Sequence, residues 1–264
     1  MSVYKNDTLD FLKVAIDSIL EQTYGDFKFY IIQDGPVSED VTSYLTSIAD
    51  SRVFLRSRIL NKGLAVSLNE LLSEVLINDD CEFVARMDAD DYSMPTRFNI
   101  QINYLKDHPE IDIVGSYISE SSNPLHESGV IVKYPLSHKD CKSLFGKRHP
   151  LAHVSVVFRK SFFDKAGLYP TDTLRDEDGM MWLNGFLTGC TFANISKVLV
   201  LVRVSESFYK RRSSKQKAKQ DHLNRLHIIK SLHLPKVNYL YAYLRYALFR
   251  FAPPFLLKVA YRIR

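Results

Sequence analysis

The stretch EFVARMDADDYSMPTRFNIQINYL, residues 82–105, places a short apolar segment, an acidic loop and a helical segment in succession. EFVARM has the composition of a buried strand. Pro95 is a favourable first residue for a helix, which we expect to run to about Asp107. A buried strand that leads through carboxylates into a helix is an arrangement that α/β proteins use at ligand-binding edges.

Three aspartates, Asp88, Asp90 and Asp91, lie in the loop between strand and helix. Carboxylates at this spacing repel one another unless a cation compensates them, and Mg²⁺ and Mn²⁺ bind such oxygen ligands. The loop therefore predicts a divalent metal site. The alternative is a solvated loop in which Asp91 or Ser93 caps the helix.

The same alternation of apolar runs and amphipathic segments extends along the first half of the chain. We expect strands at 1–5, 27–33, 52–56, 82–87 and 111–118, and helices near 9–22, 38–49 and 64–77. This order predicts an α/β fold with a mainly parallel sheet flanked by helices. Ligands bind beyond the carboxyl ends of such strands, where Asp34 and the three aspartates fall. Taken alone, Asp34-Gly35 could equally be an ordinary turn.

The second half is less regular and ends in a basic segment. We expect a strand at LAHVSVVFRK (151–160), a helix at RDEDGMMWLNGFLTG (175–189) and a strand at SKVLVLVRV (196–204). Residues 208–264 contain 14 of the 35 basic residues but one acidic residue, a net charge of +13, which leaves −8 for residues 1–207. Two regions with different partners are indicated.

The basic tail is predicted to be an amphipathic helix. One face carries apolar residues, with Arg245 and Arg250 off it; the apolar residues are Tyr239, Leu240, Tyr243, Leu244, Ala247, Leu248 and Phe251. This pattern is typical of a helix on an anionic membrane surface. A solvated face, a helical cap over the core and a nucleic-acid contact are the alternatives.

Several protein classes are disfavoured by missing patterns. The chain has no G-x-G-x-x-G and no G-x-x-x-x-G-K-[ST], which argues against dinucleotide oxidoreductases and P-loop enzymes. Its three cysteines match no zinc or CxxC pattern, so we expect no disulfide framework. The N-terminal residues do not resemble a secretory signal, which predicts a cytoplasmic location.

Several segments resemble glycosyltransferase family 2. MSVYKN, SILEQTYGDFKFYIIQDG, NKGLAVSLN and VARMDADDYSMPTRFNIQINYL are similar to its nucleotide-binding half, and RHPLAHVSVVFRK and RDEDGMMWL to its acceptor half. The resemblance covers residues 1–204 in order. It implies a GT-A fold with a nucleotide-sugar-binding half (1–118) and an acceptor-binding, catalytic half (119–208), followed here by the basic helical tail (209–264).

The resemblance also implies the chemistry of the nucleotide half. It implies transfer of a sugar from a nucleotide sugar, with UDP as the expected nucleotide, Mn²⁺ or Mg²⁺ as cofactor, and inversion at the anomeric carbon. Ser2 and Tyr4 would lie beside the base, and Asp34 would accept from the base N–H. Asp88 would reach the ribose or the metal, and Asp90 would be the direct metal ligand.

In the acceptor half, Glu177 and Asp178 match the acidic pair of the family, and Trp182 matches its tryptophan. The resemblance implies that Asp178 is the base that takes the proton of the acceptor hydroxyl. The alternative is that these carboxylates only stabilise a helix N-terminus. His153 is a candidate for the acceptor or diphosphate side. His149 and His153 have the spacing of a metal pair, but no third ligand follows at a useful spacing.

Two features depart from the family pattern. Gln33 stands where an acidic residue is usual, and the first strand lacks several apolar residues before MSVYK, which suggests a shortened or misassigned start. The combined expectation is an inverting, metal-dependent transferase on the cytoplasmic face of the inner membrane. Its acceptor would be a lipid-linked saccharide of an O-antigen, capsule or exopolysaccharide. A sugar-nucleotide nucleotidyltransferase and a membrane or nucleic-acid adaptor are the alternatives, and we expect no nucleic-acid partner.

Overall fold

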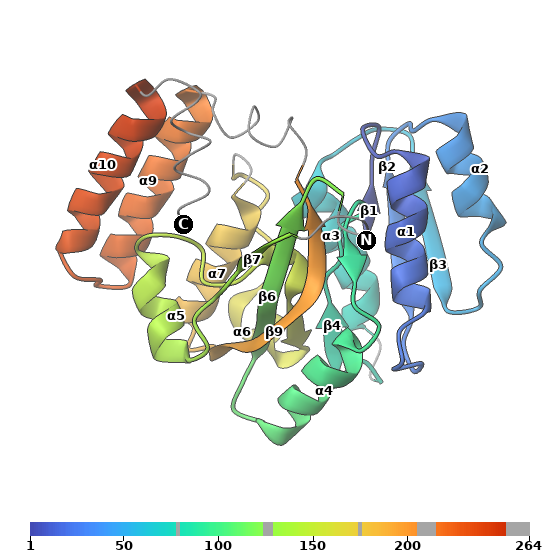
Figure 1. Cartoon of the computed structure of the whole chain (residues 1–264), viewed down its shortest axis with the longest axis horizontal. Helices are drawn as coiled ribbons and strands as arrows, with labels where there is room; N and C mark the ends of the chain where they lie inside the picture. The colour runs from blue at the N-terminus through green and yellow to red at the C-terminus, as the bar shows by residue number, and fades with distance from the viewer. Residues whose placement is uncertain (78–79, 124–128, 174–175, 205–214, 252–264) are drawn as a thin grey trace.

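The computed structural model describes residues 1–77, 80–123, 129–173, 176–204 and 215–251 (Figure 1). The first half contains β1 (Ser2–Val3), α1 (Leu9–Leu20), β2 (Phe29–Asp34), α2 (Glu39–Ser47), β3 (Val53–Arg58) and α3 (Leu64–Leu76). It continues through β4 (Phe83–Ala85), β5 (Tyr92–Ser93), α4 (Arg97–Asp107) and β6 (Ile113–Ser121). The predicted alternation of strands and helices is confirmed in this half.

The second half is built from shorter pieces before its long last strand. It contains β7 (Val130–Val132), α5 (His138–Phe145), the 3-10 helix η1 (His153–Ser155), β8 (Val157–Arg159) and α6 (Ser161–Ala166). Then follow α7 (Glu177–Leu187), β9 (Phe192–Arg203), α9 (Lys215–Ser231) and α10 (Val237–Phe251). The strand expected over 151–160 is therefore divided into a loop, η1 and the short β8.

The strands form two sheets. The first has the order β1-β2-β3 and is parallel, with Ser2 opposite Ile32 and Phe29 opposite Val53. The second has the order β4-β8-β6-β9-β5, with β7 paired to β6; its β6–β9 pair is parallel and its other pairs are antiparallel. The α/β class is confirmed, and the parallel arrangement is complete only in the first sheet.

A cavity separates the two sheets. The β1 strand has two residues, and the Met1 amino group donates to the Tyr30 carbonyl at 2.7 Å. A cavity of about 720 Å³ extends from Met1 between β2 and β4, lined by side chains that include Leu68 and Leu72 of α3 and Phe98 of α4. A strand at this position would bridge the sheets, and β1 is too short to do so.

The C-terminal helices lie at one end of the molecule, opposite α1 and α2 (Figure 1). α9 is part of the core, because its Ile228 and Leu232, the residue directly after it, are buried in the cluster that contains Phe145 and Trp182. α10 packs on α9 and buries Asn238 and Ala242, but leaves much of its apolar surface exposed. Within the described ranges, no helix has the length and apolar character that a membrane crossing requires.

Candidate active site

The aspartate loop between β4 and β5 is held by two arginines from different parts of the chain. Arg86, which is 4% exposed, forms an ion pair with Asp88, which is 38% exposed. Arg203, at the end of β9, contacts Asp90 through Nη2 at 2.9 Å, and its backbone N–H donates to Oδ1 of Asp91 at 2.8 Å. The loop is therefore fixed by contacts that are remote in sequence.

The carboxylates of this loop repel one another even beside the two arginines. Burial raises the pKa of Asp91 well above its ordinary value, and the carboxylates of Asp88 and Asp90 raise it further. Asp7 lies within electrostatic range of the same loop. Burial raises the pKa of Asp7 to about 7, and Asp90 and Asp88 contribute to the rise. An additional cation at this loop would relieve the repulsion.

Asp88 and Asp90 fit a divalent cation by their chemistry. Both are carboxylates with partly exposed side chains, 38% and 33%. Mg²⁺ is commonly bound by one or two carboxylates together with substrate phosphates and water, so a full set of protein ligands is not required. Asp91 is buried and bonded to a backbone amide, so it is a support for the loop rather than a third ligand.

Asp34, at the end of β2, organises the turn into α3. Its Oδ1 accepts from Nη2 of Arg58 at 2.7 Å and from the amide of Lys62 at 2.8 Å, and its Oδ2 accepts from the amide of Gly63 at 2.9 Å. The side chain is 2% exposed. Gly63 has φ 89°, a left-handed conformation that favours glycine. The hydrogen-bond partners of the Asp34 carboxylate are thus residues of the chain itself. Its contact with a nucleotide base stays a prediction.

The residues expected beside the base lie in or next to β1. Ser2 is in β1, and the Tyr4 amide donates to Oδ2 of Asp7 at 2.8 Å. Gln33, which replaces the usual acidic residue, donates from Nε2 to the Gly35 carbonyl at 3.3 Å. Tyr4 is thereby bonded to Asp7, which lies within electrostatic range of the aspartate loop.

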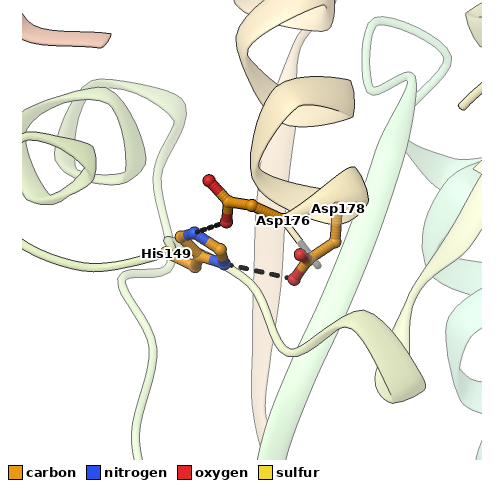
Figure 2. Close-up of side chains that lie close together, drawn as sticks. All are labelled: His149, Asp176 and Asp178. Carbon is orange, nitrogen blue, oxygen red and sulfur yellow. Dashed lines mark hydrogen bonds and ion pairs between the residues drawn. The ribbon is translucent and has the colours of Figure 1, made fainter. Parts of the chain in front are cut away.

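The second acidic group lies at the N-terminus of α7. Asp176 precedes the helix, and Glu177 and Asp178 occupy its first turn. His149 inserts between two of these carboxylates: Nε2 is 3.1 Å from Oδ1 of Asp176, and Nδ1 is 3.1 Å from Oδ2 of Asp178 (Figure 2). The helix dipole and His149 together favour ionised carboxylates here.

The electrostatics of this group follow from its ion pairs. Burial would lower the pKa of His149, but Asp178 and Asp176 outweigh it and raise that pKa to about 9. Burial would likewise raise the pKa of Asp178, but the charge and hydrogen bond of His149 hold it well below its ordinary value. Burial and the charge of Asp178 raise the pKa of Glu177, and Arg86 and Lys217 offset only part of this rise. Of the acidic pair, Asp178 is therefore the residue whose ionised form is stabilised.

The possible ligand atoms of His149, Asp176 and Asp178 lie within 4.8 Å of one another, which is close enough for a shared metal ion. However, the imidazole lies between the two carboxylates, and each carboxylate faces a different ring nitrogen (Figure 2). A histidine binds a metal ion through one nitrogen while the other is turned to a separate partner. This arrangement is that of two hydrogen bonds.

His153 lies within electrostatic range of both acidic groups. Burial lowers the pKa of His153 to about 4, Arg86 lowers it further, and both Asp178 and Asp88 act on it in the opposite direction. Its Nε2 is 2.8 Å from the Tyr169 hydroxyl. Because Asp88 and Asp178 both affect the pKa of His153, the aspartate loop and the start of α7 lie around one site.

Trp182 is buried beneath the surface of this site and packs against His153. The indole is fully buried, and its ring centre is 5.9 Å from that of His153 in an edge-to-face arrangement. Such contacts fix the orientation of the imidazole. Within the described part of the chain, Nε1 of Trp182 has no hydrogen-bond partner.

Some residues of the site were not expected from the sequence. Arg203 and Asn224 come from distant segments, and nothing in their local sequence marks them. The side chain of Asn224, in α9, donates to Oδ2 of Asp176 at 2.6 Å. His149 was noticed only for its spacing to His153, whereas its partners are the aspartates at α7.

A family model described as glycosyl transferase family 2 matches residues 1–167. The chain belongs to glycosyltransferase family 2. The transferase is 32% identical to the amylovoran biosynthesis glycosyltransferase AmsE of Erwinia amylovora, over 80% of this chain and 77% of the relative. It is 31% identical to the UDP-Gal:alpha-D-GlcNAc-diphosphoundecaprenol beta-1,3-galactosyltransferase of Escherichia coli, over 80% and 75%.

Solved structures support the GT-A fold of the transferase. The S. aureus TarS fragment 1–349 in complex with UDP-GlcNAc superposes with a TM-score of 0.64, at 16% identity, over 98% of this chain and 75% of that one. The mannosyltransferase PcManGT from Pyrobaculum calidifontis, in complex with GDP-Man and Mn²⁺, gives 0.59, also at 16% identity, over 98% and 77%. At these identities the likeness concerns the fold.

Proposed function

We propose that the transferase moves a sugar from a UDP-sugar to a hydroxyl group of a lipid-linked saccharide during synthesis of a bacterial surface polysaccharide, such as an O-antigen, capsule or exopolysaccharide. The observation that carries this proposal is the placement of His153 within electrostatic range of both Asp88 and Asp178. A diphosphate-binding group and an ionised base on opposite sides of one site are what displacement at an anomeric carbon requires. The name of the Escherichia coli relative gives UDP-Gal as its donor and GlcNAc-diphosphoundecaprenol, a lipid-linked saccharide, as its acceptor, which supports this proposal.

In this proposal the aspartate loop binds the donor. Asp88 and Asp90 would hold Mg²⁺ or Mn²⁺, and Ser2, Tyr4 and Asp34 would position the base and ribose together with Asp88. A bound divalent cation supplies positive charge to the diphosphate leaving group. Because Asp34 already accepts four hydrogen bonds from Arg58, Lys62 and Gly63, its contribution to nucleotide binding would include holding the turn around residues 61–63.

Asp178 would act as the general base, with Glu177 beside it. The acceptor hydroxyl gives its proton to Asp178 as its oxygen bonds to the anomeric carbon. The bond from that carbon to the diphosphate oxygen breaks, and its electron pair leaves with the nucleotide. Attack opposite the leaving group inverts the anomeric configuration. His153, above Trp182, would line the space between donor and acceptor.

We further propose that α10 attaches the transferase to the cytoplasmic face of an anionic membrane. Six apolar residues recur at helical spacing and are 38–77% exposed: Val237, Leu240, Tyr241, Leu244, Leu248 and Phe251. Arg245 and Arg250 flank this row, hereafter the α10 stripe. An exposed apolar stripe beside cations is typical of interfacial helices. A lipid-linked acceptor would be presented at the same surface.

A two-stage experiment tests the transfer activity. Thermal shifts with a panel of UDP- and GDP-sugars, with and without Mn²⁺, would identify the donor, because a ligand that binds the folded state raises its melting temperature. The donor is then supplied with a synthetic lipid diphosphate that carries N-acetylglucosamine, and products are read by mass spectrometry. Mn²⁺-dependent stabilisation and transfer with inversion are expected. Stabilisation by nucleoside triphosphates with sugar phosphates, and no transfer, would favour a nucleotidyltransferase.

A further inference from the structure

His149 is placed as a bridge between two carboxylates that α7 presents. Each ring nitrogen is 3.1 Å from a different carboxylate oxygen, on Asp176 and on Asp178. A neutral imidazole has one N–H donor and one lone pair, so it can donate to only one of them. Its lone pair would then face the oxygen of the other carboxylate. Two carboxylates on the two nitrogens are satisfied together only by the doubly protonated ring.

The residues around His149 leave room for the ring and hold Asp176 in place. A Cβ atom on Gly179 would lie 2.6 Å from Oδ1 of Asp176 and 2.8 Å from Nε2 of His149, so a larger residue at 179 would displace the ring. Asp176 is itself anchored, because Asn224 of α9 donates to its Oδ2. The ring of Phe145 meets the imidazole edge to face, with centroids 6.0 Å apart.

We propose that His149 is a positioning residue which, as a doubly protonated imidazolium anchored on Asp176, holds Asp178 ionised and oriented to receive the proton of the acceptor hydroxyl. This inference rests on the assignment of Asp178 as the base in the proposed function. Nδ1 of His149 bonds to Oδ2 of Asp178, and the lone pairs of the carboxylate that stay unused are available to the acceptor hydroxyl. His149 does not contact the reacting atoms, and it acts through Asp178.

Glu177, next to Asp178, shows how a carboxyl at this position behaves without a bonded histidine. Burial raises the pKa of Glu177, which has no cationic partner within hydrogen-bond distance among the described residues. Without His149, the partly buried Asp178 would be subject to the same effect, and its pKa would rise. With His149 in place, the carboxylate is ionised over the whole neutral range. The cost is a weaker base, because a hydrogen bond to the charged form lowers its proton affinity.

The experiment uses the full chain with the donor and acceptor found above. In His149→Ala we expect kcat to fall by roughly tenfold to a hundredfold, a part of the 10²–10⁴-fold that a general base supplies, with the donor KM unchanged. The His149 side chain is 26% exposed, so added imidazole can reach the vacated position and restore part of the turnover. His108→Ala is the matched control, because His108 lies at the surface beside Glu110 and should neither lose turnover nor respond to imidazole.

The protonation state of the His149 ring can be measured independently of activity. In ¹⁵N NMR spectra near pH 7.5, above the ordinary imidazole pKa of about 6.5, both His149 nitrogens should have protonated shifts, and Asp178→Asn should make the ring deprotonate at lower pH. A neutral ring, or full turnover in His149→Ala, would overturn the proposal. Lost turnover that imidazole does not restore, together with a raised donor KM, would make His149 a fold support and also overturn it. Failure of the proposed function is distinct, since the wild type would then transfer no sugar.

Discussion

Nδ2 of Asn224 donates to Oδ2 of Asp176 at 2.6 Å, and this bond joins α9 to the segment that carries the candidate base. A second bond from the same helix runs from the buried guanidinium of Arg225 to the carbonyl of Phe145, on the other side of His149. The helix α9 is thus a structural part of the second half of the fold, and of the two described C-terminal helices only α10 remains as a surface attachment.

Replacing Asn224 tests this link. Asn224→Ala removes one partner of Asp176, a carboxylate that is 5% exposed, so the free energy of unfolding should fall by about 1–3 kcal/mol. Urea denaturation measures the change, with Lys219→Ala on the exposed face of α9 as the control. Equal stability of the two variants would mean that water replaces Asn224 without loss.

The α10 stripe is expected to determine membrane attachment. In Leu240→Ser/Leu244→Ser, two side chains that are 60% and 62% exposed lose their apolar surface without disturbing the core. A fully buried leucine contributes roughly 1.5–3 kcal/mol, so binding to phosphatidylglycerol vesicles should weaken by about tenfold or more. Truncation is a poorer test, since removal of α9 would open the core.

The matched control for this experiment is Ile77→Ser/Leu187→Ser, which changes two residues of similar exposure, 81% and 54%, outside α10. It should co-sediment with vesicles as the wild type does. If the α10 variant also co-sediments fully, the stripe serves another purpose, such as contact between two copies of the chain.

An apolar N-terminal extension should stabilise the transferase. The Met1 amino group is buried, burial lowers its pKa to about 5, and it bonds to Tyr30 as a peptide N–H in a parallel ladder would. About five β-branched residues placed before Met1 would extend β1 into the cavity between β2 and β4 and gain burial. Each kcal/mol gained should raise the melting temperature by about 2–4 °C. An extension of the same length made of glycine and serine is the control, and equal melting temperatures for both would contradict this prediction.

Much of the fold was predictable because its signals are local. The helices expected near 9–22, 38–49 and 64–77 are observed as Leu9–Leu20, Glu39–Ser47 and Leu64–Leu76. Their apolar residues repeat at helical spacing, which the sequence displays directly. The acidic groups after β2 and β4 were likewise visible as polar residues that follow apolar runs.

Pairing between distant segments was not predictable. Arg203 reaches Asp90 across 113 positions, and β8 and β5 pair antiparallel with strands that are remote in sequence. Nothing local distinguishes Arg203 from other arginines of a basic chain. His149 was visible as a histidine, but its role depends on the approach of α7, which only the tertiary structure provides.

Asp90 is expected to be needed for metal-dependent donor binding. In Asp90→Ala, one of the two partly exposed carboxylates that fit a divalent cation is lost, so Mn²⁺-dependent affinity for the nucleotide sugar should fall by more than the roughly 10–100-fold typical of an outer partner. Calorimetry with and without Mn²⁺ measures it. Asp164→Ala, an exposed aspartate of α6, is the control. Unchanged Mn²⁺ dependence in Asp90→Ala would exclude Asp90 as a ligand.

Asp178 is expected to be the base of the acceptor half. Asp178→Asn keeps the shape of the side chain but removes its proton-accepting charge, so turnover should fall by roughly 10²–10⁴-fold. Donor affinity should stay nearly constant, because the donor is assigned to Asp34, Asp88 and Asp90 in the other half. Steady-state kinetics and calorimetry measure the two quantities separately.

Glu177→Gln is the natural comparison for this variant. Glu177 occupies the same turn of α7, but burial raises its pKa, whereas His149 lowers that of Asp178. If Glu177 were the base, Glu177→Gln would lose turnover and Asp178→Asn would keep it, because the group that receives the proton must be the one removed. If both variants retain turnover, the carboxylates at the start of α7 only stabilise the helix and His149, and the base must be sought elsewhere around His153.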